Sequence, residues 1–295
     1  MKKIIHHILF GNYFYGLCAL ALTVEATLQQ ELHFLHPLYY IIIFLSSIFY
    51  YNEAYIHLND PKSYNPRTRW YFHHAKTIKI IQSILFLGIC ISGIVYFNKI
   101  SPQLKNILSH FNPQYLIILI FPVAGYLYYL NLRNVGWLKP ILIGFTWSGV
   151  VTVLPVVVNS IENDIPLIFH LINILLFIKN MMFVIVLCIL FDIKDYAADY
   201  NQSVKTFVVK YGLRNTLFYI CLPLSILGLG TFIGYGIYRD FSSIKILFNT
   251  IPFVFLFIVA YSMRNRKSIF YYLFIIDGLM VLKGLCGSIA MYFFS

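Results

Sequence analysis

Residues 166–199 read PLIFHLINILLFIKNMMFVIVLCILFDIKDYAAD, an almost unbroken apolar run that ends in three aspartates. As a helix, residues 166–191 are long enough to cross a bilayer core about 30 Å thick. Inside hydrocarbon, backbone polar groups must be satisfied within a helix or a closed barrel. The run is too long and too uniformly apolar for an alternating barrel strand, so it predicts a transmembrane helix.

The rest of the chain has the same character. Of its 295 residues, 60% are hydrophobic and 11% are charged, and the mean hydropathy is +0.75. A soluble domain carries roughly a quarter charged residues, so this chain has too few charges to coat a solvated surface. Apolar runs recur from end to end without a polar block between them. We therefore expect one membrane domain over residues 1–295, an all-α polytopic bundle.

Nine segments are long and apolar enough to be counted as spans. They are residues 8–26, 37–57, 79–98, 114–131, 138–158, 166–191, 216–237, 246–263 and 269–294. The first resembles a signal peptide, but it ends in a poor cleavage site and many spans follow it. We therefore expect it to be retained as a transmembrane helix.

The basic residues orient these spans. Sixteen Lys and Arg fall at the N-terminus and in one set of alternate loops, and four fall in the opposite loops. Because basic loops stay on the cytoplasmic side, we expect a cytoplasmic N-terminus in a plasma membrane, such as the bacterial inner membrane. The formal net charge of +11 is spread in short clusters rather than one stripe. Anionic membrane lipid is therefore the expected partner, and nucleic acid is not.

The acids that end residues 166–199 are Asp192, Asp195 and Asp199. Spacings of three and four residues place all three carboxylates on one helical face. Stacked acids repel one another, and their natural complement is a divalent cation. Mg²⁺ is favoured because it binds through a few carboxylates together with a substrate's phosphates. The alternative is a solvated helix end, where acids are tolerated.

The end of the second expected span carries a weaker version of this pattern. Glu53, Ile56 and Asp60 repeat the three-then-four spacing, with an apolar residue at the centre. Asn52 precedes them and Arg67 follows in the next loop. The charge asymmetry places both acidic helix ends in the same compartment. Together they could hold Mg²⁺ and a diphosphate.

The two groups resemble the Asp-rich motifs of the UbiA superfamily of intramembrane prenyltransferases. The family's second motif, Asp-x-x-Asp-x-x-x-Asp followed by a basic residue and Thr, is complete in Asp192, Asp195, Asp199, Lys205 and Thr206. The first motif, Asn-Asp-x-x-Asp-x-x-x-Asp, is degenerate. Residues similar to it and to the family's later signals are Asn52, Glu53, Asp60, Asn65-Pro66-Arg67 and Leu138-Lys139, with Ile56 replacing an acid.

The resemblance implies Mg²⁺-dependent transfer of a prenyl chain from its diphosphate to a small hydrophobic or aromatic acceptor, such as a quinone precursor. By the resemblance, Asp192, Asp195 and Asp199 are catalytic, and they bind the metal together with Glu53 and Asp60. Asn52, Arg67, Lys139 and Lys205 are the expected contacts of the diphosphate and substrate. Each of these basic residues could also simply anchor a cytoplasmic loop.

Ile56 departs from the family pattern because an aliphatic side chain cannot bind Mg²⁺. An enzyme with fewer ligands, an enzyme with an altered substrate and a non-catalytic relative are all compatible with it. A transporter is a further alternative, and it predicts polar residues at mid-membrane depth in several spans. The spans hold few such charges. We expect Lys179 to pair with Asp277, Lys283 to lie in the last span, and Glu25 and Glu31 to face water.

Overall fold

The computed structural model describes residues 2–57, 61, 65–109, 112–130 and 135–294 of the chain. Of the chain, 84% is helical, and the described residues form no strand, as the apolar runs predicted. Asp60, the last acid of the first motif, lies outside the described residues.

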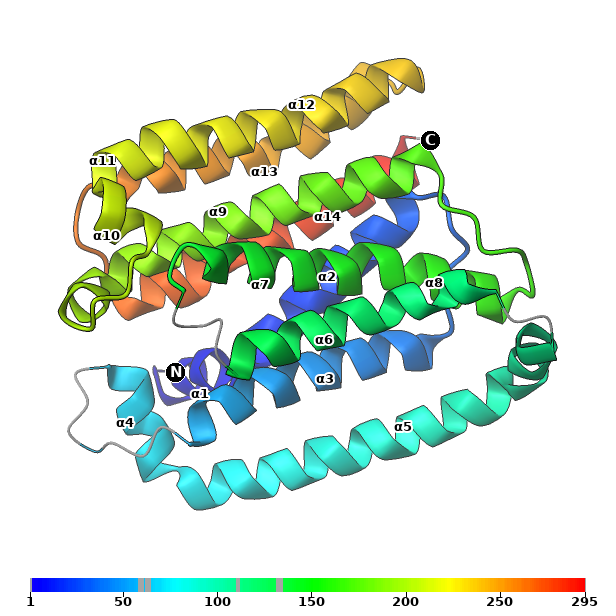
Figure 1. Ribbon diagram of the computed structural model, residues 1–295, viewed down its shortest axis with the longest axis horizontal. Helices are drawn as coiled ribbons and strands as arrows, with labels where there is room; N and C mark the ends of the chain where they lie inside the picture. Colours follow the sequence, from blue (N-terminus) through cyan, green and yellow to red (C-terminus); the bar gives the residue numbers. More distant parts are fainter. Residues whose placement is uncertain (1, 58–60, 62–64, 110–111, 131–134, 295) are drawn as a thin grey trace.

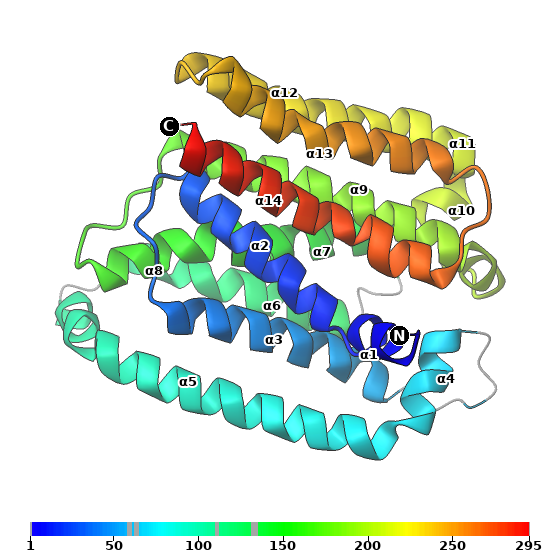
Figure 2. The same cartoon turned by 180° about the vertical axis from the view of Figure 1, so that it is seen from behind.

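The helices lie side by side and run between the two ends of a bundle (Figures 1 and 2). The first half contains α1 (Lys2–Phe10), α2 (Tyr13–Gln29), α3 (Pro37–Ile56), α4 (Pro66–His73), α5 (Ala75–Ser109), η1 (Pro113–Leu116) and α6 (Ile117–Leu130). The second half contains α7 (Leu138–Ser148), η3 (Gly149–Val153), α8 (Leu154–Glu162), α9 (Leu171–Asn201), α10 (Phe207–Tyr211), α11 (Leu213–Thr216), η4 (Leu217–Cys221), α12 (Leu222–Tyr238), α13 (Ser243–Ser262), η5 (Tyr271–Ile276) and α14 (Gly278–Phe293).

Six helices in the described part are long and apolar enough to cross a membrane. They are residues 75–105, 138–162, 171–201, 213–238, 243–262 and 271–293. A seventh span is added if α1 and α2, bent by 58°, are counted together. Two further expected spans do not meet this test of length and hydropathy. Helix α3 contains several tyrosines, Asn52 and Glu53, which make it more polar. Helix α6 is apolar but short. The structure thus supports a polytopic membrane bundle, and the number nine stays a prediction.

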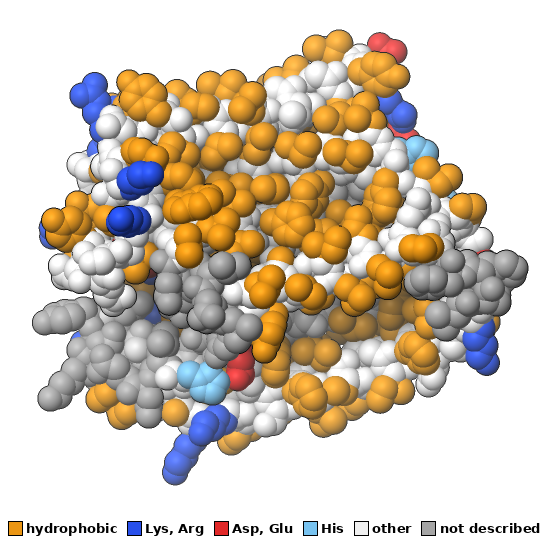
Figure 3. All heavy atoms as spheres, viewed as in Figure 1, with side chains coloured by type: hydrophobic (Ala, Val, Ile, Leu, Met, Phe, Trp, Pro, Cys, Tyr) orange, Lys and Arg blue, Asp and Glu red, His pale blue; other side chains and the backbone are white. Residues whose placement is uncertain are grey.

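The outer faces of the bundle are apolar. Hydrophobic side chains cover the middle of the face in Figure 3, while Lys and Arg gather toward its edges. The outlying helix α5 exposes Ile80, Ile84, Leu87, Ile91 and Ile94, each by more than half of its surface. Such a surface is stable against lipid tails and would not be soluble in water.

Close packing of α2 against α14 holds the centre of the bundle, and Figure 2 shows these helices side by side. A Cβ atom on Gly284 would lie 2.6 Å from the backbone carbonyl carbon of Ala21, so only glycine allows this approach. Small residues at such contacts are typical of membrane helix pairs. The largest apolar cluster surrounds this contact and includes Leu22, Phe183, Phe253 and Ile276.

The two acidic helix ends lie at the same end of the bundle. The last turns of α3 and α9 reach the left side of Figure 1, where α1, α4, α10 and the start of α7 also lie. We call this the motif end, defined by Glu53 and Ile56 on α3 and Asp192, Asp195 and Asp199 on α9. The common location agrees with the sequence analysis.

Candidate active site

The three aspartates of α9 differ in their surroundings, although they share one helical face. Asp192 is fully buried, and its Oδ1 accepts a hydrogen bond from Lys139 Nζ at 2.7 Å. Asp195 lies one turn further on, half-exposed, with Lys194 Nζ 3.4 Å from its Oδ2. Asp199 is partly buried at the last turn. The helix therefore presents one enclosed, one half-exposed and one partly buried carboxylate at the motif end.

Lys139 comes from the first turn of α7, which is fixed against the loop that follows α9. Gly136 packs so closely on this loop that a Cβ atom would lie 2.5 Å from the Lys205 carbonyl carbon and the Thr206 nitrogen. Thr206 is buried and caps α10 by accepting a hydrogen bond from the Val209 backbone N–H at 3.3 Å. The structure thus brings the segments of Lys139 and Lys205 together beside the aspartates. Lys205 itself is exposed.

Two carboxylate oxygens of this group are suited to a cation. Asp192 Oδ2 and Asp199 Oδ2 are buried and accept no hydrogen bond within the described part of the molecule. A buried acceptor without a partner is rare in folded proteins and calls for an ion, a water or a ligand. The described residues contain no group of three metal-binding side chains. A cation here would therefore take its remaining ligands from water and a substrate's phosphates, as Mg²⁺ commonly does.

Asn52 and Arg67, two of the residues expected to bind substrate, lie in a buried polar network at the end of α3, and their role toward substrate stays a prediction. Asn52 Oδ1 accepts hydrogen bonds from Asn12 Nδ2 at 2.9 Å and from the Tyr71 hydroxyl at 2.7 Å. Arg67 donates to the Asn12 side chain, to the Phe10 carbonyl at 3.3 Å and to the Tyr55 hydroxyl at 3.2 Å. Its guanidinium also lies 4.0 Å over the Tyr55 ring. Arg67 and Asn52 therefore join α1, α3 and α4 at the motif end.

Burial of the Tyr71 hydroxyl favours its neutral form. It raises the pKa of the Tyr71 hydroxyl, which stays protonated and donates to Asn52. Asn12, at the bend between α1 and α2, adopts a left-handed backbone with φ 62°. The sequence analysis missed Asn12 and Tyr71, whose single polar groups in apolar surroundings gave no periodic signal.

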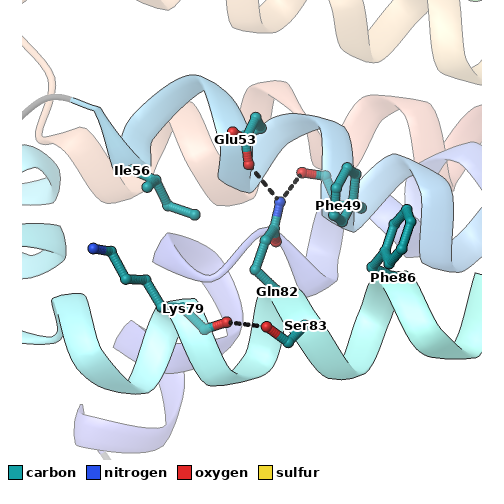
Figure 4. Close-up of a pocket in the computed structure, with 7 residues that line it drawn as sticks. All are labelled: Phe49, Glu53, Ile56, Lys79, Gln82, Ser83 and Phe86. Carbon is teal, nitrogen blue, oxygen red and sulfur yellow. Dashed lines mark hydrogen bonds between the residues drawn. The ribbon is translucent and has the colours of Figure 1, made fainter.

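Glu53 faces α5 rather than the interior. It lines a groove of about 420 Å³ together with Phe49, Ile56, Lys79, Gln82, Ser83 and Phe86 (Figure 4). Gln82 Nε2 donates to Glu53 Oε2 at 3.0 Å, and the His57 ring lies 3.1 Å from Oε1. Its role as a metal ligand stays a prediction, and its carboxylate has protein partners on both oxygens.

Ile56 has a packing role that explains its apolar character. It lies against a buried cluster of Leu9, Phe10, Trp70, Tyr71, Ile78 and Leu273. A carboxylate at this position would lose the apolar contacts with this cluster and would be partly desolvated against it, which is costly. The acid that the family has here is thus replaced by a residue that ties α3 to α1 and α4.

Two predictions about charges inside the spans are wrong. Glu25 does not face water: it is 1% exposed and binds both Lys179, at 3.3 Å, and Lys283. Lys179 therefore pairs with Glu25 rather than with Asp277. Lys179 also donates to Gln29 Oε1 at 2.7 Å. The distances along the sequence gave no means of choosing among these partners. Glu31 is exposed and pairs with Arg239 at 2.9 Å.

The fold is similar to that of a solved structure of digeranylgeranylglyceryl phosphate synthase, a UbiA-family prenyltransferase. The match has a TM-score of 0.57 and covers 99% of both chains at 13% sequence identity. At this identity, the likeness is one of fold, and it confirms the membrane fold that the Asp-rich motifs predicted. No family model matches the sequence, and no curated protein matches it.

Proposed function

We propose that the protein transfers a prenyl chain from a prenyl diphosphate to a small hydrophobic or aromatic acceptor within the membrane. The observation that carries this proposal is the buried Asp192, which is neutralised by Lys139 on one oxygen and lacks a partner on the other. The shared fold with a prenyltransferase adds to it. A buried carboxylate with a free oxygen at the end of an apolar bundle fits a metal–diphosphate headgroup whose chain extends into the membrane.

The chemistry needs stabilisation of a leaving diphosphate. When bound, Mg²⁺ supplies positive charge that neutralises the diphosphate as the allylic C–O bond breaks. Asp192, Asp195 and Asp199 are the residues that would hold it. Lys139, which binds Asp192 in the structure, would be placed to donate to a phosphate oxygen when the metal is held by Asp192. Lys205 is close by in the chain segment that packs on Gly136 and adds a second cationic donor.

We also propose an orientation of the bundle in the membrane. We place the N-terminus and the motif end in the cytoplasm and count nine crossings of a plasma membrane, such as the bacterial inner membrane. The concentration of Lys and Arg in the loops on this side supports that orientation. A cytoplasmic motif end would receive its charged diphosphate from the compartment in which soluble metabolism takes place.

A second candidate is a non-catalytic or divergent relative of these enzymes. It is favoured by the state of the first motif: Ile56 is packed in an apolar cluster, and Glu53, Asn52 and Arg67 already have protein partners. A transporter is less well supported, because the buried charges Glu25, Lys179 and Lys283 bind one another in a single cluster that joins three helices.

The test is an assay of purified protein in lipid nanodiscs with Mg²⁺. Geranyl, farnesyl and geranylgeranyl diphosphates are offered with phenols, naphthols and glycerol-based alcohols, and products are detected by mass spectrometry. Wild type should release diphosphate and form a prenylated product, and Asp195→Asn should lose this activity. Asp240→Asn is the matched control, since Asp240 is exposed beyond the end of α12. Equal activity in wild type and Asp195→Asn rejects the catalytic proposal.

A further inference from the structure

The groove between α3 and α5 at the motif end is open to the outside of the bundle (Figure 4). It measures about 420 Å³, and α5 contributes Lys79, Gln82, Ser83 and Phe86 to its lining. Lys79, Ser83 and Phe86 are exposed on the same helix whose other outward side chains are apolar. Because that surface of α5 is covered by lipid tails, the groove beside it is in contact with bilayer lipid.

The lining of this groove changes from aromatic to charged along the two helices. At one end the rings of Phe49 and Phe86 lie 6.0 Å apart between centroids. Helix α3 runs toward the motif end and α5 runs away from it, so Glu53 and Lys79 lie nearer that end (Figures 1 and 4). Charged residues at the end of a membrane span lie at the level of the lipid headgroups. The groove therefore has the polarity of an amphiphile with its head at the motif end and its chain toward the bilayer centre.

Glu53 and Lys79 offer opposite charges in this groove. The Glu53 side chain is 45% exposed, and its two oxygens contact Gln82 at 3.0 Å and the His57 ring at 3.1 Å. A carboxylate has about four acceptor positions, so Glu53 has room for further donors. Among the described residues, no carboxylate lies at ion-pair distance from Lys79. The two charges thus share one groove without pairing with each other.

Gln82 adds an acceptor that calls for a donor. Its Nε2 donates to the Phe49 carbonyl at 2.8 Å and to Glu53 Oε2 at 3.0 Å, so both amide hydrogens are used and the orientation of the amide is fixed. The Gln82 side chain is 92% buried, and its Oε1 accepts no hydrogen bond in the described part of the protein. Buried acceptors are rarely left without a partner. This part of the groove therefore favours a ligand that brings N–H groups.

We propose that the groove binds a phospholipid with an ethanolamine headgroup. The ammonium group donates to the Glu53 carboxylate beside the Gln82 amide, and the phosphate accepts from Lys79. An acyl chain passes over Phe49 and Phe86 toward the bilayer centre. One acidic and one basic side chain match the two charges of this zwitterion. The lipid in this position joins α3 to α5, which lies at the edge of the bundle in Figure 1.

Other amphiphiles match these side chains less well. Phosphatidylglycerol, like a prenyl diphosphate, provides oxygens for Lys79 but brings no cation to Glu53. A choline headgroup has the same two charges as ethanolamine, but its methylated nitrogen has no N–H to donate. The groove should therefore distinguish ethanolamine from choline by hydrogen bonding and from glycerol by charge.

Native mass spectrometry of the purified protein tests this, with dioleoyl phosphatidylethanolamine, phosphatidylcholine and phosphatidylglycerol as probes of identical chains. Wild type should bind the ethanolamine lipid about tenfold more tightly than the other two, as expected for one hydrogen bond to a charged group. Lys79→Met and Glu53→Gln should each reduce this preference to about twofold or less. Lys76→Met is the matched control, since Lys76 is exposed on α5 but does not line the groove, and it should keep the wild-type preference.

Equal affinity of wild type for the ethanolamine and choline lipids overturns the proposal. So does an unchanged preference in a folded Lys79→Met or Glu53→Gln variant, with folding checked by thermal unfolding in detergent. Lys79 is exposed, so Lys79→Met decides the matter if Glu53→Gln does not fold. A loss of preference in Lys76→Met would assign the effect to general surface charge and also overturn the proposal. The measurement needs no prenyl transfer, so its outcome is independent of the proposed function.

Discussion

Lys139 Nζ lies 2.7 Å from Oδ1 of Asp192, and this ion pair joins the first turn of α7 to the last turns of α9. The Asp192 side chain is fully enclosed, while the lysine is one quarter exposed. Enclosure makes the pair sensitive to the loss of either member, because a buried charge without its partner is costly. The pair is therefore both a structural contact and the centre of the candidate active site.

Removal of the lysine should destabilise the protein. Lys139→Met leaves the Asp192 carboxylate uncompensated and should lower the free energy of unfolding by about 3 kcal/mol. Lys205→Met removes an exposed cation of the same region and should change stability by about 0.5 kcal/mol or less. Thermal unfolding in detergent measures both. Equal stability of the two variants would contradict a structural role for the ion pair.

Glu25, Lys179 and Lys283 form a buried charge cluster, and we expect their substitutions to differ in their effect on the free energy of unfolding. Glu25→Gln leaves Lys179 and Lys283 buried without an anion, so it should be the most damaging change, at about 3–5 kcal/mol. Lys179→Met leaves a balanced Glu25–Lys283 pair and should cost less, or even stabilise the protein. Thermal unfolding of the variants, with the exposed Glu31→Gln as control, tests this predicted order of stabilities. A Lys179→Met variant less stable than Glu25→Gln would refute it.

Restoring the family's acid at position 56 should not restore a metal ligand. Ile56→Asp places a carboxylate against the cluster of Leu9, Phe10 and Trp70, and we expect a loss of stability of about 2–4 kcal/mol. The affinity for Mg²⁺ with geranylgeranyl thiolodiphosphate should stay within about twofold. Ile56→Val, which keeps an apolar side chain, is the control. Tighter Mg²⁺-dependent binding by Ile56→Asp would show that this position opens to the substrate.

Arg67 should behave as a structural residue rather than a diphosphate ligand. Arg67→Lys keeps a positive charge but cannot make the separate contacts to Asn12, Tyr55 and the Phe10 carbonyl. We expect a lower unfolding temperature, with an affinity for the thiolodiphosphate close to that of wild type. A stable Arg67→Lys variant with a tenfold or greater loss of affinity would instead assign Arg67 to the substrate.

The positions of the helices could be predicted from the sequence, because lipid demands long apolar runs and the runs are visible without a structure. Their ends could not, because α5 continues to Ser109 and α9 to Asn201, beyond the apolar runs. The shared end of the Glu53 and Asp195 segments also followed, since successive spans alternate in direction. Burial of Glu25 could not be predicted. Its partners are 154 and 258 positions away, and nothing local distinguishes a carboxylate that meets two lysines from one that meets water.

Packing between helices also determines the surroundings of Glu53. The spacing places Glu53 on the helix face of Ile56 and Asp60, and neighbouring residues on a helix, such as Asn52 and Glu53, point about 100° apart. Asn52 therefore points toward Asn12 and Tyr71, while Glu53 points toward Gln82 on α5. Motif spacing places residues on a helix, and packing of the neighbouring helices decides which side chains each of them contacts.

The proposed function depends on the α9 aspartates as the site that holds a prenyl diphosphate. Mg²⁺-dependent binding of geranylgeranyl thiolodiphosphate, measured by calorimetry in nanodiscs, tests this most directly. Wild type and Asp240→Asn should bind with equal affinity in the presence of Mg²⁺ and bind weakly without it, and Asp195→Asn should lose at least tenfold. Binding by Asp195→Asn at the wild-type affinity, or equal binding with and without Mg²⁺, would contradict this role of the α9 aspartates.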